Sequence, residues 1–154
     1  MKKALVLSAP IGLITLVEEN GALTEVRFGR RMEDCVPESS PVLELAARQL
    51  KEYFCGERRE FTVPVRLQGT PFQLRCWQAL LQIPYGETRT YGWQAAAAGS
   101  PGACRAVGMA NHRNPLPVIV PCHRVVGADG KLTGYAGGVD VKQTLLQIER
   151  MNLK

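Results

Sequence analysis

Residues 118–126 (VIVPCHRVV) constrain the fold of this chain more than any other stretch. Two apolar, β-branched runs flank a proline and three reactive side chains, inside a segment that otherwise indicates a buried strand. A lone cysteine in such a place is most often a structural core residue. Burial of an adjacent histidine and arginine is costly without partners. The segment therefore favours a functional interpretation for Cys122 and His123, whereas Arg124 is assigned a structural role.

Charge is distributed unevenly along the 154 residues, whose formal net charge is +5. Residues 1–67 carry ten acids and ten bases, whereas residues 68–154 carry nine bases and four acids. The length suits one domain or two small ones. We expect two domains, residues 1–67 and residues 68–154. The basic excess predicts a polyanionic partner for the second domain. An ordinary solvated basic face is the alternative.

Cysteine usage and hydropathy exclude several classes of protein. The five cysteines are widely spaced without a CxxC pair, and there are only two histidines. A disulfide framework and a zinc site are therefore not expected, and a reducing, cytoplasmic location is. No apolar run is long enough to span a membrane. The N-terminal residues indicate a first strand and not a signal peptide.

Residues 1–67 are predicted to form a small scaffold. Strands are expected at 3–8, 13–18 and 22–28, with a hairpin turn at Asn20-Gly21. A helix should follow at 41–54, capped by Ser40, and then a short strand near 61–65. The result is a three-stranded antiparallel sheet with a covering helix and no catalytic constellation.

Residues 68–154 are predicted to be mostly helical, which gives an α/β (α+β) fold class overall. Helices are expected at 71–82, 91–98, 101–113 and 140–151, with Thr70, Ser100 and Asp140 as N-caps for the first, third and fourth. The second and third form a helix-turn-helix. On the third, one face should pack inward (Ala103, Ala106, Val107 and Ala110), and the other is small or basic (Arg105, Gly108, Met109 and His112).

Glu149 is anomalous in the last predicted helix, because it lies beside an apolar face that contains Leu145 and Ile148. A glutamate there needs a partner unless it is a boundary residue that reaches solvent. The available partner is His123. Cys122, His123 and Glu149 then supply a nucleophile, a base and an orienting carboxylate. Neighbours in an extended chain face opposite ways, so a water is expected to carry the proton between Cys122 and His123.

The motif Pro121-Cys122-His123-Arg124-Val125 resembles the signature of the O6-alkylguanine-DNA alkyltransferases, the methylated-DNA–protein-cysteine methyltransferases. The resemblance covers residues 70–151 closely and the first domain loosely. It includes Ile83-Pro84-Tyr85-Gly86-Glu87-Thr88, Tyr91, Ala103-Cys104-Arg105-Ala106-Val107-Gly108, Asn111, Asn114-Pro115, Tyr135-Ala136-Gly137-Gly138 and Lys142. The loop from Gly134 to Gly138 is similar to that of the bacterial constitutive type.

The resemblance implies roles for individual residues. Cys122 would accept the alkyl group, His123 and Glu149 would relay its proton, and Tyr91 would donate to the departing guanine. The base pocket would comprise Asn114 as a hinge, Val125, Tyr135, Ala136, Gly137 and Lys142. Arg105 would enter the duplex as a finger, on a helix that meets the minor groove through Ala103, Gly108 and Met109.

The function implied by the resemblance is single-use repair of O6-alkylguanine in double-stranded DNA, with O4-alkylthymine as an open second substrate. No cofactor or metal is needed, and a monomer is expected. Three alternatives differ in class. A non-enzymatic sensor of alkylated bases would lack the cysteine, and a helix-turn-helix regulator leaves Cys122, His123 and Glu149 unexplained. A cysteine hydrolase would require turnover and an oxyanion hole, and nothing beyond Cys122, His123 and Glu149 indicates one.

Overall fold

The computed structural model describes residues 1–132 and 134–153. The backbone contacts divide the chain into two compact units, Met1–Leu67 and Gln68–Lys154. Each unit buries apolar side chains of its own. Within the described residues, no helix combines the length and the apolar character needed to cross a membrane.

Three antiparallel strands form the sheet of the first unit, in the order β1 (Lys2–Ala9), β2 (Gly12–Glu19) and β3 (Ala22–Phe28). The turn between β2 and β3 lies at Asn20 and Gly21, whose φ angles are 53° and 81°. Two positive values are characteristic of a type I′ turn, which matches the twist of paired strands. The three predicted strands and their hairpin turn are confirmed.

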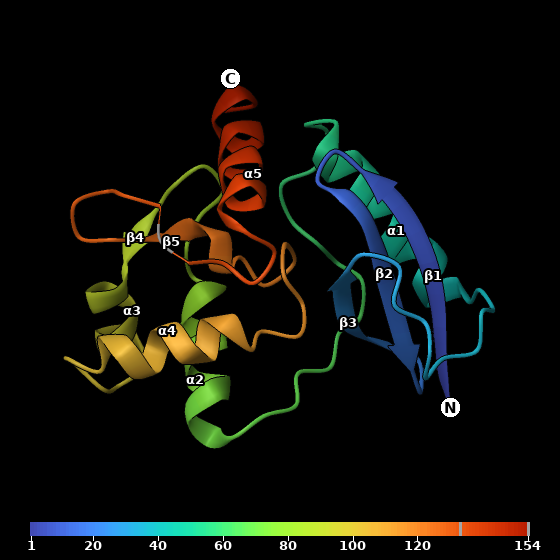
Figure 1. Ribbon diagram of the computed structural model, residues 1–154, viewed down its shortest axis with the longest axis horizontal. Helices are drawn as coiled ribbons and strands as arrows, with labels where there is room; N and C mark the ends of the chain where they lie inside the picture. The colour runs from blue at the N-terminus through green and yellow to red at the C-terminus, as the bar shows by residue number, and fades with distance from the viewer. Residues whose placement is uncertain (133, 154) are drawn as a thin grey trace. The chain divides into compact units, whose positions relative to one another are not determined.

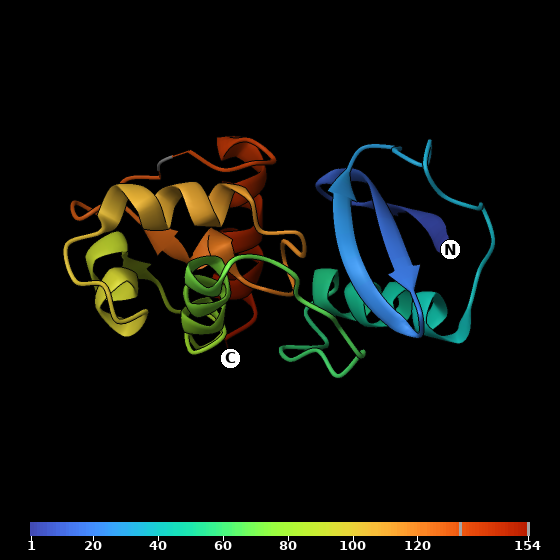
Figure 2. The same cartoon turned by 90° about the horizontal axis from the view of Figure 1, so that it is seen from below.

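Helix α1 (Pro41–Phe54) covers one face of this sheet (Figures 1 and 2). It begins where predicted, because Ser40 accepts a hydrogen bond from the Leu43 N–H at 3.2 Å and proline occupies the first helical position. The core of the unit lies between helix and sheet. Its fully buried side chains include Ile14, Leu16, Leu23, Leu43 and Leu50.

The prediction of a short strand near residues 61–65 is wrong. In its place, the structure has an isolated parallel bridge between Val65 and Leu23. The buried side chain of Gln49 accepts hydrogen bonds from the N–H groups of Thr62 and Val63 at 3.0 and 3.1 Å, and donates to Thr62 Oγ1 at 2.6 Å. A side chain thus satisfies backbone groups that a strand ladder would otherwise use.

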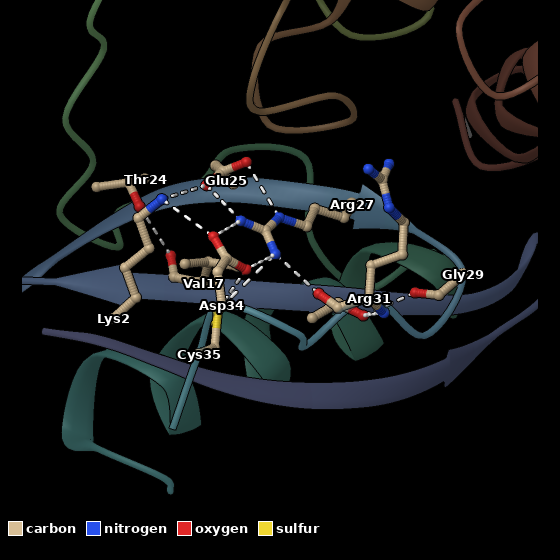
Figure 3. Close-up of polar contacts among 10 residues, drawn as sticks. Lys2, Val17, Thr24, Glu25, Arg27, Gly29, Arg31, Asp34 and Cys35 are labelled. Carbon is tan, nitrogen blue, oxygen red and sulfur yellow. Dashed lines mark hydrogen bonds and ion pairs between the residues drawn. The ribbon is translucent and has the colours of Figure 1, made fainter. Parts of the chain in front are cut away.

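Arg27 on β3 organises the polar segment that follows the sheet (Figure 3). Its guanidinium donates to Glu25 at 3.1 and 2.9 Å, to Asp34 at 2.7 and 3.0 Å, and to the Arg31 carbonyl at 2.8 Å. Lys2 Nζ lies 3.4 Å from Asp34 Oδ2. The hydrogen bond from Arg27 holds the pKa of Asp34 well below its usual range. This network attaches the irregular segment after β3 to the sheet.

The second unit is mostly helical, and Figure 1 shows its elements: α2 (Pro71–Leu80), α3 (Tyr91–Ala97), α4 (Cys104–His112), a 3-10 helix η1 (Cys122–Arg124) and α5 (Val139–Met151). Strand β4 (Arg89–Thr90) pairs in parallel with β5 (Val125–Val126). Buried hydrogen bonds join the first three helices. The Trp77 indole donates to the Ala110 carbonyl at 2.9 Å, and Gln94 and Asn111 exchange bonds of 2.7 and 2.8 Å.

The helix expected at residues 101–113 begins later than predicted. Pro101 and Gly102 form a turn in which Gly102 has a φ of 84°. Helix α4 therefore starts at Cys104, after Ala103 at the N-cap, and no side chain caps it. The prediction of Ser100 as N-cap is wrong, because the left-handed backbone at Gly102 interrupts any helix from Pro101.

Two further details of the helices differ from expectation. Ala106 is exposed, and the buried side of α4 consists of Val107, Ala110 and Asn111. Asp140 lies within the first turn of α5, whose N-cap is Gly138. The other three helices end within two residues of their predicted bounds. The α+β class is confirmed, with an antiparallel sheet and helix followed by a mostly helical unit that contains the helix-turn-helix pair α3 and α4.

The turn at Gly102 generates a stability prediction. We expect Gly102→Ala to lower the free energy of unfolding by about 1 kcal/mol, because a left-handed backbone is unfavourable for any residue with a Cβ, although no atom lies within 4 Å of the added methyl. Gly92→Ala in α3 is the matched control. Its Cβ would lie 3.7 Å from Thr90 Oγ1, so we expect a gain of about 0.5 kcal/mol from helix propensity.

Urea unfolding followed by tryptophan fluorescence measures both effects, because the two tryptophans, Trp77 and Trp93, lie in this unit. A change of the same sign and size for both substitutions would contradict the assignment of backbone strain to the turn.

Candidate active site

Residues 118–126 do not form the interrupted strand that the sequence suggests. Residues 117–119 form a turn, η1 follows, and strand geometry is confined to β5. Val118 has a φ of 74° while it is only 1% exposed. That conformation is rare for a β-branched side chain, and such strain persists only where the surroundings enforce it.

Asn114 provides the physical reason for this turn. Its Oδ1 accepts a hydrogen bond from the Leu116 N–H at 2.9 Å, and its Nδ2 donates to the Val120 carbonyl at 2.8 Å and to Cys122 Sγ at 3.3 Å. The bond from Leu116 fixes the amide orientation, so the nitrogen and not the oxygen faces the sulfur. Asn114 therefore folds the segment back on itself and presents a donor to the thiol.

A small cavity lies beside Cys122. Its lining consists of Tyr91, Gly108, Asn111, His112, Cys122, Gly134, Tyr135 and Ala136. Tyr91, at the start of α3, and Cys122, at the start of η1, reach this cavity from separate segments of the second unit. The cavity volume is about 10 Å³, which is room for about one water molecule.

The surroundings of Cys122 keep its sulfur protonated at rest. Burial raises the pKa of the thiol, while the hydrogen bond from Asn114, the nearby hydroxyl of Tyr135 and the charge of Lys142 act in the opposite direction but do not cancel it. Burial also lowers the pKa of Lys142, whose side chain is 1% exposed. The sulfur becomes a nucleophile only when a base removes its proton.

His123 and Glu149 make the contact that the sequence predicts: Nε2 lies 2.6 Å from Oε2, and both residues are fully buried. Glu149 also accepts hydrogen bonds from Arg124 Nε at 2.9 Å, from Arg124 Nη2 at 3.0 Å and from the Gly86 N–H at 3.1 Å. Four donors use the full accepting capacity of a carboxylate. Burial alone would raise the pKa of Glu149, but His123 and Arg124 lower it to about 2.

The charge of Glu149 determines the tautomer of His123. An ionised carboxylate only accepts hydrogen bonds, so the ring proton lies on Nε2 and the Nδ1 lone pair is available. Nδ1 is buried and has no hydrogen-bond partner among the described residues. Burial lowers the pKa of His123 below its ordinary value, and it outweighs the opposing effect of Glu149. His123 is therefore a neutral base with its accepting nitrogen unused.

The structure brings together part of the predicted residue set. Four of those residues line the cavity with Cys122: Tyr91, Gly108, Tyr135 and Ala136. Asn114 contacts the sulfur, and Lys142 acts on it through its charge. Val125, buried in β5, and Gly137, in the turn before α5, do not contribute to the cavity lining. Arg105 and Met109 are exposed on α4, and Ala103 is half-buried at its N-cap.

Several other contributors to the site were assigned no role in it from the sequence. Asn111 and His112 line the cavity, and Gly86 and Arg124 donate to Glu149. A buried arginine beside His123 was an available signal for Arg124. A backbone N–H such as that of Gly86 leaves no signal in residue type. Among the described residues, no group of three or more His, Cys, Asp or Glu side chains could hold a metal ion.

Comparison with known proteins covers both units. The family model for the ribonuclease-like domain of 6-O-methylguanine DNA methyltransferase matches residues 2–67. The family model for the DNA binding domain of the same enzyme matches residues 71–151. A methylated-DNA–protein-cysteine methyltransferase of Mycolicibacterium paratuberculosis is 50% identical over 146 residues, which cover 92% of this chain and 88% of the relative. A constitutive enzyme of that name from Bacillus subtilis is 47% identical over 154 residues, with coverages of 94% and 93%.

A solved structure agrees with these relatives. Mycobacterium tuberculosis OGT in complex with DNA superimposes with a TM-score of 0.89 at 47% identity, and the match covers 98% of this chain and 93% of that one. These matches cover nearly the whole chain, and therefore both units. The chain belongs to the 6-O-methylguanine DNA methyltransferase family.

Proposed function

We propose that this protein repairs O6-alkylguanine in double-stranded DNA by one irreversible transfer of the alkyl group to Cys122. The observation that carries this proposal is the thiol at the wall of a small cavity, with the Asn114 amide on its sulfur and the His123–Glu149 pair directly behind it. The names of the relatives and of the DNA complex support the substrate and the partner.

The proton path follows from the tautomer of His123. The thiol proton passes through one water to Nδ1, and Glu149 stabilises the imidazolium that forms. Adjacent residues of a 3-10 helix point about 120° apart, so a bridging water suits the pair better than a direct hydrogen bond. Asn114 donates to the thiolate and stabilises its charge.

The transfer itself balances without a cofactor. The thiolate attacks the alkyl carbon in line, an S–C bond forms, and the bond from that carbon to O6 breaks. Its electron pair stays on the guanine, which gains one proton for the one that the thiol lost. Tyr91 on the cavity wall donates a hydrogen bond to the departing base. The thioether resists hydrolysis, so each molecule acts once.

The DNA side of the reaction involves α4. A target atom inside a duplex is unreachable, so the nucleotide must be flipped out at a cost of a few kcal/mol. Arg105 fills the vacated place in the stack, and the helix around Gly108 and Met109 lies in the minor groove. The flipped base enters the cavity that Tyr91, Cys122 and Tyr135 line.

We also propose that the protein acts as a monomer in the cytoplasm. All five of its cysteines are free thiols, a state that a reducing compartment maintains.

Methyl transfer is the direct test of the function. After incubation with a duplex that contains one O6-methylguanine, we expect the tryptic peptide 114–124 to gain one methylene, because Cys122 is its only cysteine. Transfer should stop at one equivalent per protein. Cys122→Ala should bind the same duplex and transfer nothing. Repeated turnover would indicate a hydrolase, and tight binding with an unmodified Cys122 would indicate a sensor; either would overturn the proposal.

Arg105→Ala tests the flipping step. Removal of the side chain that fills the stack should slow transfer from duplex DNA by about tenfold or more, the factor that corresponds to about 1.4 kcal/mol, and leave transfer from the free base unchanged. Arg150→Ala removes the same charge from the exposed side of α5 and is the control for loss of general attraction to DNA. Equal losses on duplex and free base would exclude the finger role.

A further inference from the structure

Arg124 makes more directed contacts than a residue with a purely packing role requires. Its side chain is 8% exposed. It donates two hydrogen bonds to Glu149, at 2.9 and 3.0 Å, and a third to the Ile83 carbonyl at 2.7 Å. The guanidinium carbon lies 5.6 Å from the centre of the Tyr85 ring. All of the guanidinium nitrogens therefore have partners, and the planar fork is fixed in one orientation.

These contacts join three separate segments at the carboxylate. Arg124 belongs to η1, Glu149 to α5, and Ile83 and Tyr85 to the turn that precedes β4. The same turn donates the Gly86 N–H to Glu149 Oε1. Arg124 and Gly86 thereby occupy Oε1, and Arg124 shares Oε2 with His123. Rotation of the carboxylate away from His123 would break several of these bonds at once.

The charges around His123 require a cation at this place. The charged groups that act on the imidazole are Glu149 and Lys142 from α5 and Arg124 from η1. With Glu149 alone, a buried histidine and carboxylate would share one proton and one negative charge. Arg124 forms a bidentate ion pair with the carboxylate and neutralises its negative charge. The imidazole then has no negative charge to balance and can remain neutral.

We propose that Arg124 is a positioning residue for alkyl transfer: it holds Glu149 ionised and oriented, and so keeps His123 a neutral base whose Nδ1 is available to accept a proton. The proposal deepens the proposed function and rests on it for its effect on rate. Nothing in it requires Arg124 to touch DNA or the alkyl group.

The test separates the charge of Arg124 from its geometry with two variants. Arg124→Met removes both, and Arg124→Lys keeps the charge but loses the two-point contact. Single-turnover transfer from O6-methylguanine in duplex DNA is measured across pH for each. In parallel, the ring nitrogens of His123 are followed by 15N NMR. Only two histidines are present, so a His112→Gln background assigns the signals.

We expect Arg124→Lys to transfer the alkyl group about 10- to 100-fold more slowly, the loss typical of a displaced catalytic group. The acid limb of its pH–rate profile should lie near that of the wild-type protein. Arg124→Met should be at least as slow. Its acid limb should move to higher pH by about one unit or more. The sign follows because loss of a nearby positive charge raises the pKa of His123, and transfer requires the neutral ring. The wild-type spectrum at pH 7 should show a neutral ring with its proton on Nε2.

Wild-type rate in Arg124→Lys, or an unshifted acid limb in a folded Arg124→Met, would overturn the proposal. If Arg124→Met does not fold, Arg124→Lys and the wild-type His123 spectrum still decide it. A wild-type protein that transfers no alkyl group would refute the proposed function instead, and the tautomer and protonation of His123 in the variants would still test Arg124 independently.

Discussion

A fully buried carboxylate is the constraint on which the second unit depends. Glu149 is completely excluded from solvent, yet it carries a charge, because donors from η1 and from the turn before β4 saturate both of its oxygens. Removal of one partner would leave an uncompensated buried charge, which typically costs about 3–5 kcal/mol. The positions of α5, η1 and that turn are therefore linked. Gly86 contributes to this link, because its φ of 81° is a left-handed conformation that strains any residue with a Cβ.

The same arrangement would protect the nucleophile of the proposed single transfer before use. Burial raises the pKa of the Cys122 thiol and lowers that of His123, so the resting pair is neutral and not a thiolate with an imidazolium. A thiol in that state reacts slowly with oxidants and stray electrophiles. Proton transfer becomes favourable when a substrate carbon is in line with the sulfur. Under the proposed single transfer to Cys122, an inert resting state conserves the one reaction available to each molecule.

Residue type and spacing were sufficient for much of the fold and for the centre of the site. Apolar stretches bounded by turn residues predicted the three strands, and Ser40 and Thr70 predicted helix starts that their side-chain hydrogen bonds bear out. The anomalous Glu149 pointed to His123. The failures share a cause, since each depends on a specific side-chain hydrogen bond or on a backbone angle that residue type does not reveal. Gln49 replaces a strand, the φ of Gly102 delays α4, and Asn114 turns an apolar run that composition alone marks as extended.

The candidate active site depends above all on Glu149 remaining ionised wherever the protein is folded. The direct measurement is the 13C chemical shift of its side-chain carboxyl group, followed from pH 8 down to the onset of acid unfolding. The four hydrogen bonds predict a constant shift, with no titration until the structure is lost. Titration near the ordinary glutamate value of about 4.3 in the folded protein would contradict the account, because His123 would then lack the anion that fixes its tautomer.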